Sequence, residues 1–388
     1  MPHRFTPLSM ERLVAWISDE LTAQDAILGI PRELFFRPQP RGPLELHWRG
    51  ARLDTPIGVA AGPHSQLAAN IVAAWLCGAR VIELKTVQTL DEITVAKPCI
   101  DMEDAGYNIE WSQELTLDQS FDEYLHAWVL VHALHHRLGL PGDGPGVVFD
   151  VSVGYDLKGI RQPNMQRFLE RCLDAGRELD RAAAAVAARI PEAAAVVIPR
   201  RLASGITLST MHGCRPEEVG LIAGYLMDRW RLPTSVKLNP TLLGAEEVAH
   251  ILHDELGFQD ITLSKEAFDG DPTFAEAVGL IRELTAVAER RGVSFGLKLA
   301  NTLPVVNHRE VFDLEQARMY LSGRPLHAVA VRLASRLQEE LEGRLAISFA
   351  GGADAFNTPA LLAAGLAPVT TCSDLLRPGG YLRLRQYL

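Results

Sequence analysis

The feature that most constrains the fold is a series of short apolar runs that do not alternate with polar residues. Nine such runs occur after residue 55, and they begin at residues 57, 80, 147, 205, 235, 260, 293, 345 and 368. Apolar strands that alternate with stretches of helical spacing are typical of a parallel sheet covered by helices. Because the series is long and no linker rich in Pro, Gly or Ser divides it, it predicts a closed TIM (β/α)₈ barrel.

The predicted barrel spans residues 51–388, and an N-terminal helical extension, residues 1–50, precedes it. In the extension, residues 9–28 space their apolar positions at three and four, which predicts an amphipathic helix capped by Ser9. Nine runs compete for eight places, so one of them must lie outside the barrel. The long stretch 86–140 predicts an inserted segment after the second strand, over the barrel mouth.

Composition narrows the classes of partner. The 388 residues carry a formal net charge of −10 without a long block of Lys or Arg, so we do not expect a nucleic-acid partner. No apolar run reaches the roughly 18 residues of a membrane span, and the N-terminal residues resemble no signal peptide, so we expect a cytoplasmic protein without a membrane partner. Five scattered cysteines argue against a zinc site, an iron–sulfur cluster or a disulfide framework, and we expect no metal.

The residues that end the predicted strands indicate the chemistry, because barrel active sites lie at the C-terminal ends of the strands. These ends are rich in Gly, Ser, Thr, Asn and Lys, which suits a large anionic organic cofactor better than a divalent metal. Gly351 and Gly352 follow an apolar run and precede a helix that begins near Asn357. Their backbone N–H groups could bind a phosphate, although a plain strand-to-helix turn has the same composition.

Residues 209–214, Ser-Thr-Met-His-Gly-Cys, follow the run at 205 and place three reactive groups together. These groups are the hydroxyl of Thr210, the imidazole of His212 and the thiol of Cys214. They are candidates for a catalytic loop; the alternative is an ordinary polar turn.

Several motifs, in their order along the chain, give a resemblance to a known family. They are TPIGVAAG (55–62), ELKT (83–86), GYNIEW (106–111), TLSTMHG (207–213), VKLNPT (236–241), ANT (300–302), YLSG (320–323), FAGGAD (349–354) and TTCSDL (370–375). The series resembles the flavin barrel of dihydroorotate and dihydropyrimidine dehydrogenases. A narrower resemblance, over nearly the whole chain, is to the N-terminal barrel of the YgfK-type selenate reductase subunit, a subfamily whose members usually continue into iron–sulfur and FAD or pyridine-nucleotide segments.

The resemblance implies FMN bound at the barrel mouth. The matching cofactor positions are Ala61, Gly62, Lys85, Thr86 and Lys237 around the ring system, and Ser322, Gly323, Gly351, Gly352, Cys372 and Ser373 around the phosphate. The matching substrate positions are Asn108, Asn239, Asn301 and Thr302. Both 236–241 and 296–302 could supply the fifth strand, so Lys298 competes with Lys237 for the position beside the flavin.

The resemblance also raises a question about the proton donor. Dihydropyrimidine relatives have a cysteine at the position of Thr210, and a hydroxyl is a much weaker acid than a thiol with a pKa of about 8.5. Thr210 would therefore need a relay through His212 or water, or Cys214 would replace it. The alternative is that Thr210 is only the end of a strand and Cys214 a small buried residue.

These features together imply an FMN-dependent oxidoreductase that transfers hydride between the flavin and a purine- or pyrimidine-like nitrogen heterocycle. Electrons would be exchanged with a partner subunit that carries iron–sulfur, FAD or NAD(P)H sites, and the chain could form a homo-oligomer. One alternative is a non-catalytic barrel that acts as a scaffold in a selenium- or molybdenum-linked hydroxylase complex. Another is a Schiff-base aldolase built on Lys237 or Lys298.

Overall fold

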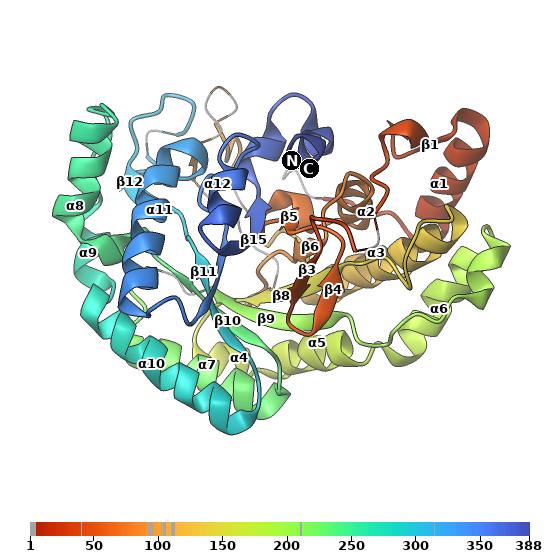
Figure 1. The fold of residues 1–388 in the computed structure, drawn as a ribbon, viewed down its shortest axis with the longest axis horizontal. Helices are drawn as coiled ribbons and strands as arrows, with labels where there is room; N and C mark the ends of the chain where they lie inside the picture. Colours follow the sequence, from red (N-terminus) through yellow and green to blue (C-terminus); the bar gives the residue numbers. More distant parts are fainter. Residues whose placement is uncertain are drawn as a thin grey trace.

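Eight parallel strands form a closed barrel in the computed structural model, which describes residues 5–39, 41–91, 96–101, 103, 106–109, 113–209, 212–313 and 315–388. The strands are β5 (Ile57–Val59), β6 (Val81–Glu83), β8 (Val148–Val153), β9 (Ala203–Ser209), β10 (Thr234–Leu238), β11 (Phe295–Leu299), β14 (Ala346–Phe349) and β15 (Leu366–Thr371). They pair in this order, and β15 pairs with β5 to close the ring (Figure 1). The predicted (β/α)₈ barrel is confirmed.

The strand register settles which of the nine apolar runs lies outside the barrel. Strands β10 and β11 are neighbours, and Lys237 is the register partner of Lys298, so both competing motifs belong to the barrel as its fifth and sixth strands. The run at 260–264 is not a barrel strand. It lies along β12 (Leu303–Val306) instead, where the N–H of Val306 donates to the carbonyl of Thr262 at 2.8 Å.

Helices surround the barrel and bury their apolar faces against it (Figure 1). They are α2 (Ala68–Leu76), α3 (Leu117–Arg137), α4 (Leu157–Ile160), α5 (Pro163–Leu173), α6 (Gly176–Ala187), α7 (Pro216–Trp230), α8 (Ala245–Ala249), α9 (Lys265–Gly270), α10 (Phe274–Arg291), α11 (Gly323–Glu340) and α12 (Thr358–Ala363). Capping boxes at Thr116 and Thr273 begin α3 and α10. Arg336 of α11 donates to Glu247 of α8 at 2.9 Å and ties these two helices together.

Short helical turns complete the connections between these elements. They are η1 (Arg32–Leu34), η2 (Pro63–Ser65), η3 (Pro191–Ala195), η4 (Pro240–Leu243), η5 (His250–Glu255, a π-helix), η6 (Ser373–Leu376) and η7 (Gly380–Gln386). No helix among the described residues is long and apolar enough to cross a bilayer.

The N-terminal segment contains α1 (Met10–Gln24), which begins after Ser9 as predicted, and two hairpins. The hairpins pair β1 (Ala26–Ile27) with β2 (Ile30–Pro31) and β3 (Leu46–Trp48) with β4 (Ala51–Leu53). The expected boundary at residue 50 falls in the turn of the second hairpin. From this turn, Arg49 reaches into the barrel, where it forms an ion pair with Asp150 and donates to Ser235 Oγ at 2.6 Å. The hairpin therefore fills the end of the barrel at which the strands begin.

A small antiparallel sheet lies at the other end, at the barrel mouth. Its order is β12, then β13 (Arg318–Leu321), then β7 (Tyr107–Asn108), so it joins the segment after β11, the segment before α11 and the insertion after β6. The predicted inserted segment is thus confirmed, but it is shorter than 86–140. Residues 117–137 form the barrel helix α3, because their apolar positions pack against α2 and the barrel core.

Candidate functional site

One pocket opens where the strands end, and separate parts of the chain line it. Its wall comes from the ends of β5, β10, β11, β14 and β15, from the first turn of α11, and from Gly106 of the insertion. The predicted residues that line it are Ala61, Lys237, Thr302, Ser322, Gly323, Gly352, Cys372 and Ser373. The sequence motifs therefore converge on one cavity at the barrel mouth.

One end of the pocket is built from closely packed backbone. Gly323, at the start of α11, has φ +57°, and Gly352, after β14, has φ +70°; both are in the left-handed region that favours glycine. A Cβ atom on Gly352 would overlap the carbonyl of Gly323, and a Cβ on Gly323 would lie 3.1 Å from Cβ of Ser373. Three strand-end segments thus meet beside a helix N-terminus, whose partial positive charge suits a phosphate.

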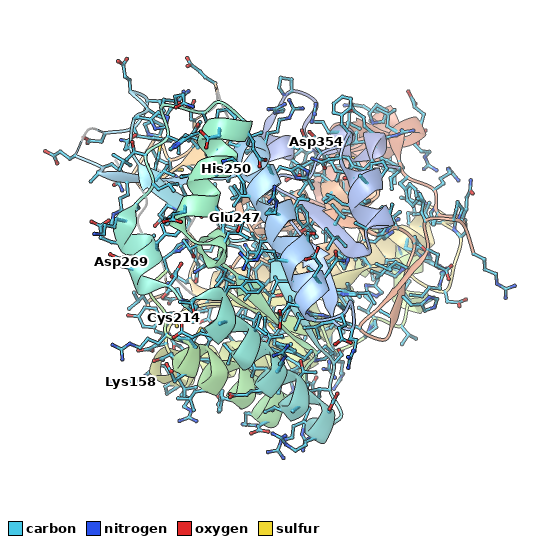
Figure 2. The ribbon with its side chains drawn as sticks, turned by 60° about the vertical axis from the view of Figure 1, so that its left-hand side comes forward. Lys158, Cys214, Glu247, His250, Asp269 and Asp354 are labelled. Atoms are coloured by element: carbon cyan, nitrogen blue, oxygen red, sulfur yellow. The ribbon has the colours of Figure 1, made fainter. Side chains whose placement is uncertain are left out.

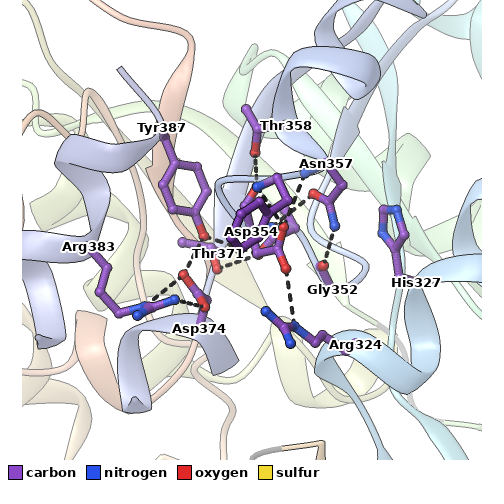
Figure 3. Close-up of polar contacts among 12 residues, drawn as sticks. Arg324, His327, Gly352, Asp354, Asn357, Thr358, Thr371, Asp374, Arg383 and Tyr387 are labelled. Carbon is purple, nitrogen blue, oxygen red and sulfur yellow. Dashed lines mark hydrogen bonds and ion pairs between the residues drawn. The ribbon is translucent and has the colours of Figure 1, made fainter. Parts of the chain in front are cut away.

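The loop after β14 is held in shape by Asp354 and Asn357 (Figure 3). The Asp354 carboxylate accepts the N–H groups of Phe356 and Asn357 at 2.9 and 3.1 Å, and Asn357 Nδ2 donates to the Gly352 carbonyl at 3.1 Å. Gly351 lies behind the pocket wall, where a Cβ would overlap Ala330 of α11. Gly351 therefore lets the loop pack closely against α11, and Gly352 forms part of the pocket wall.

Two arginines, Arg324 and Arg377, add positive charge at this end of the pocket. Arg324 Nε lies 3.2 Å from the Asp354 carboxylate (Figure 3), whereas Arg377 forms no ion pair with any described residue. The neighbouring Asp374 is already neutralised by Arg383 at 2.8 Å and accepts a hydrogen bond from Tyr387 (Figure 3). The balance of charge at this end therefore favours an anion.

Lys237 faces the pocket from the end of β10. Its side chain is partly exposed, and its ammonium forms no hydrogen bond or ion pair with a residue that the structure describes. Burial lowers the pKa of Lys237, Glu83 opposes this shift, and the like charge of Lys298 adds to it. Lys298, the competing lysine, points into the barrel, where it forms an ion pair with Glu83 and donates to Thr370 at 2.6 Å. Of the two lysines, Lys237 is the one that lines the pocket.

Lys85 and Thr86 lie below the pocket wall at the end of β6. The Lys85 side chain is buried. Burial of the Cys372 thiol raises its pKa to about 12, and the positive charge of Lys85 partly opposes this rise. The Thr86 hydroxyl lies 2.8 Å from the Ser152 hydroxyl. Neither residue lines the cavity, and their predicted contact with a cofactor stays a prediction.

The loop after β5 is attached to the end of β15. Burial lowers the pKa of His64 to about 4, so the ring is neutral near pH 7. His64 Nε2 lies 3.2 Å from the carbonyl of Cys372 and therefore carries the proton that is donated to it. Gly62 donates its N–H to Ser65 Oγ at 3.3 Å and lies outside the cavity lining, next to Ala61, which lines it.

Asp271 joins the loops on the opposite side of the mouth. It lies between α9 and α10, its side chain is only 1% exposed, and it accepts four hydrogen bonds. The donors are His212 Nδ1 at 2.6 Å, the Gly213 N–H at 2.6 Å, Thr241 Oγ1 at 2.6 Å and Asn239 Nδ2 at 2.9 Å. Burial alone would raise the pKa of Asp271, but these donors outweigh it and the pKa is lowered. An ionised carboxylate thus ties the 212–213 loop to the end of β10.

His212 is held at both ring nitrogens. Nδ1 faces the Asp271 carboxylate, and Nε2 lies 3.0 Å from the carbonyl of Thr302. Both partners accept hydrogen bonds, so only a ring with two N–H groups satisfies both at once. Thr210, the predicted partner of His212 in proton transfer, lies outside the described residues.

Two of the three predicted substrate asparagines form a chain of amides. Asn301 Nδ2 donates to Asn239 Oδ1 at 2.6 Å, and Ser209 Oγ donates to Asn301 Oδ1 at 3.4 Å. Because Asp271 can only accept, it fixes the direction of this chain through Asn239. Asn108 lies elsewhere, on β7, and donates to Ser322 Oγ at 3.2 Å, at the end of the pocket formed by Gly323 and Gly352. The four predicted substrate residues therefore do not form one cluster.

Cys214 lies apart from the main pocket. It borders a mostly apolar cavity between α7 and α10, on a different side of the molecule from Asp354 (Figure 2). Lys237 and Asn239 of β10 and the turn after it also line this cavity. Burial raises the pKa of Cys214 to about 11, and Glu218 and Asp271 add to the shift. With this raised pKa, the thiol is a weak acid and stays neutral near pH 7.

Comparison with known proteins identifies the family. The family model described as "Oxidoreductase YgfK, N-terminal TIM-barrel domain" matches residues 28–388. The chain belongs to this family. It is 41% identical over 397 residues to "Putative oxidoreductase YgfK" from Escherichia coli K12 and, equally, to the protein of that name from E. coli O157:H7. The alignment covers 97% of this chain but 38% of each relative, so the chain spans well under half the length of these curated relatives.

Solved structures share the fold of this YgfK-family barrel. Ligand-free DHODH from Eimeria tenella has a TM-score of 0.53 over 97% of this chain and 92% of its own. DHODH from the same organism in complex with ferulenol has a TM-score of 0.55 over 100% of this chain and 92% of its own. Both are 16% identical in sequence, so the likeness is one of fold.

Sequence reasoning missed several residues of the YgfK-family site. Arg377 lies in the stretch Leu-Arg-Pro-Gly-Gly after the last barrel strand. This place after a strand end is the signal that could have identified it. Arg324 comes directly after the Ser-Gly pair at the start of α11. Asp271 had no local signal, since its partners are about 30 and 59 residues away along the chain. Among the described residues, no group of His, Cys, Asp and Glu is arranged to hold a metal ion.

Proposed function

We propose that this YgfK-family domain binds FMN at the barrel mouth and acts as a flavin-dependent oxidoreductase. The observation that carries the proposal is one pocket with a backbone cradle at one end and, on its wall, a lysine that pairs with no residue the structure describes. When bound, a flavin supplies hydride-transfer chemistry that amino-acid side chains lack. The substrate class that we propose is a purine- or pyrimidine-like nitrogen heterocycle.

The phosphate end fits the group. Gly323, Gly352 and Ser373 would surround the phosphate, and the cradle between the glycines is one that a Cβ atom would fill. Arg377 has no ionic partner among the described residues and would balance the phosphate charge. Ser322 precedes α11 and would contribute the N-terminal charge of that helix.

Lys237 would lie beside the pyrimidine edge of the ring system. A fixed cation there stabilises the negative charge that develops on the ring during reduction. Ala61 would contact the ring through its backbone, and Lys85, Thr86 and Gly62 would support this wall from below. This assignment places the charged groups where the cofactor needs them, at its phosphate and at its redox-active end.

The amide chain on the far side of the mouth would bind the heterocycle. Amide groups pair with carbonyl and N–H groups of a planar ring because each offers a donor and an acceptor. The proton would come from the 209–214 loop, with Thr210 or a water molecule as the donor. The raised pKa of Cys214 and its place outside the main pocket disfavour it for this step, and His212, held at both nitrogens, would keep the loop closed.

Electrons would pass between this barrel and iron–sulfur, FAD or NAD(P)H sites located outside residues 51–388. We also propose a cytoplasmic protein that works without nucleic acid or membrane, and a homo-oligomer is compatible with the barrel fold. Pull-down of the chain with its co-expressed neighbours, followed by size-exclusion chromatography, tests both the electron partner and the oligomeric state.

The cofactor is tested by the visible spectrum of the untreated protein. A yellow protein that releases FMN on denaturation supports the proposal, and so does an apoprotein that takes up added FMN. Riboflavin, which lacks the phosphate, is the matched control and should bind more weakly. A colourless protein that gains no flavin absorbance with added FMN refutes the proposal.

The substrate class is tested by reoxidation of the photoreduced holoprotein without oxygen. Uracil, orotate, hypoxanthine and xanthine are supplied one at a time, and the return of the flavin absorbance is followed. Reoxidation by a heterocycle supports the oxidoreductase. Flavin binding without reoxidation by any member of a broad panel favours the scaffold alternative.

A second candidate, the Schiff-base aldolase, has one observation in its favour. Lys237 faces the pocket and its pKa is lowered by burial, which is a property of lysines that attack carbonyl groups. Borohydride treatment in the presence of small aldehydes and ketones would attach the substrate to Lys237 if this were the reaction. Absence of such an adduct, together with FMN binding, leaves the oxidoreductase.

A further inference from the structure

A buried ion pair lies under the pocket, and the proposed function gives it no part. Glu83 on β6 and Lys298 on β11 meet across the barrel interior, where they are 4% and 1% exposed. Thr370 on β15 joins them: it accepts from Lys298 Nζ at 2.6 Å and donates to Glu83 Oε1 at 2.9 Å. Three strands thus contribute to this group, and none of the three side chains lines the cavity.

The pair is nevertheless connected to the pocket in two ways. The second carboxylate oxygen of Glu83 accepts the backbone N–H of Ala61 at 3.3 Å, and Ala61 lines the cavity. In the β10–β11 register, Lys237 is the partner of Lys298. Burial would raise the pKa of Glu83, but the charges of Lys298 and Lys237 and the hydrogen bond from Thr370 outweigh it, and the pKa is lowered. Glu83 is therefore ionised and interacts with both lysines.

The charges in this part of the barrel do not cancel. Next to the pair, Asp150, the register partner of Glu83, forms its own ion pair with Arg49. Lys237 and Lys298 both act on the Glu83 carboxylate, and the buried Lys85 adds a further positive charge near Cys372. Because Glu83 is already engaged by Lys298 and Thr370, the excess positive charge remains on Lys237. A partly buried charge without a partner is costly unless a ligand supplies the opposite charge.

We propose that Glu83 and Lys298 are positioning residues that keep Lys237 unpaired and thereby set the reduction potential of the bound flavin. The proposal rests on the proposed function and deepens it. With Glu83 held by Lys298, the charge of Lys237 acts fully on the reduced ring. Without Lys298, Glu83 pairs with Lys237, and the reduced ring loses that stabilisation.

Two substitutions should shift the flavin in opposite directions. Lys298→Met leaves Glu83 free to pair with Lys237, so reduced FMN should bind at least tenfold more weakly relative to oxidised FMN. For a two-electron couple this corresponds to a potential lower by about 30 mV. Glu83→Gln removes the carboxylate whose charge acts on both lysines and should raise the potential. The double variant Glu83→Gln/Lys298→Met again leaves Lys237 unpaired and should return to within threefold of the wild-type ratio.

The potential is measured by reduction of the FMN-loaded protein against a reference dye, together with the Kd for oxidised FMN. Lys158→Met removes an exposed lysine and is the matched control (Figure 2). Recovery in the double variant distinguishes positioning from a packing defect, because a packing defect would be as large or larger when both residues are changed. If Lys298→Met does not fold, the rise expected in Glu83→Gln and the recovery in the double variant still decide the question.

A second readout needs no flavin. Trinitrobenzenesulfonate modifies unprotonated amines, and pairing with a carboxylate protects an amine from it. In the apoprotein, Lys237 should be modified at least threefold more slowly in Lys298→Met than in wild type, and at the wild-type rate in the double variant. If wild type takes up no FMN, the proposed function fails while this labelling still tests the pairing. The inference is overturned if the ratio of reduced to oxidised FMN binding stays within threefold of wild type in both single variants and the labelling rate of Lys237 stays within threefold of wild type in Lys298→Met.

Discussion

The carboxylate of Asp271 is the contact whose loss should most affect the candidate catalytic loop. It accepts from His212, Gly213, Asn239 and Thr241 and connects three segments that are distant in sequence. Asp271→Asn keeps the shape of the side chain and removes its charge. We expect this change to release the loop after β9 without unfolding the barrel, because the eight-strand core does not depend on Asp271.

The size of the effect follows from the four hydrogen bonds. A hydrogen bond to a charged group contributes about 1.5–3 kcal/mol and a neutral one about 0.5–1.5 kcal/mol. The amide oxygen of Asn can replace Oδ2, which accepts from three donors, but only as a neutral acceptor. Its NH₂ group then faces the N–H of Gly213, and such a mismatch costs about 1–3 kcal/mol. Together these losses should reduce the stability of the closed loop by about 3 kcal/mol, or roughly a hundredfold in its opening equilibrium.

Amide hydrogen exchange measures this equilibrium directly, since the Gly213 N–H is one of the four donors. Exchange of this amide should become roughly a hundredfold faster in Asp271→Asn, while core amides of β9 and β10 should keep their wild-type rates. Asp269→Asn makes the same charge change on the exposed surface of α9 and is the control (Figure 2). Exchange of Gly213 within threefold of wild type in Asp271→Asn would refute the reasoning. Because the pKa of Asp271 is lowered, its contribution is present above the ordinary pKa and is lost as the pH falls through the folded value.

Two further predictions concern the cradle and the pH dependence of stability. Gly352→Ala should weaken FMN binding at least tenfold because the added Cβ overlaps the carbonyl of Gly323. Gly343→Ala is the control, because Gly343 also has a positive φ but a Cβ there meets no atom within 4 Å. Equal Kd values for the two variants would contradict the cradle. Glu123 accepts the Ala68 N–H at 2.6 Å, and burial raises the pKa of Glu123 to about 7. The folded protein should therefore lose stability as the pH rises from about 4.5 through 7, by about 3 kcal/mol in total. Urea unfolding of Glu123→Gln between pH 5 and 8 should lack this decline, and a wild-type slope would show the assignment to be wrong.

Much of the architecture could be predicted because its signals are local. The apolar runs, the helix capped by Ser9 and the inserted segment are each written in a few neighbouring residues, and the structure confirms them. The run at 260–264 has the same local pattern as a barrel strand. Only the register shows that it lies beside β12, because eight strands already close the ring.

The candidate site was predictable only in part, because local patterns do not encode contacts across the barrel. Motifs at strand ends converge on one pocket because parallel strands bring their C-terminal ends together. Which side chain faces that pocket depends on its neighbours across the barrel. Thus Lys298 turns inwards to Glu83 and Thr370, while Lys237, its register partner, reaches the cavity.

By itself, the sequence determined the strand–helix alternation and the glycines and amides that end the strands, since local spacing and side-chain chemistry carry this information. The tertiary structure decided that Asp271 holds His212, that Cys214 borders a second cavity, and that one lysine keeps its charge available. These outcomes depend on hydrogen bonds and charge balance between residues far apart in the chain. No local pattern encodes them, because each exists only once the barrel has closed.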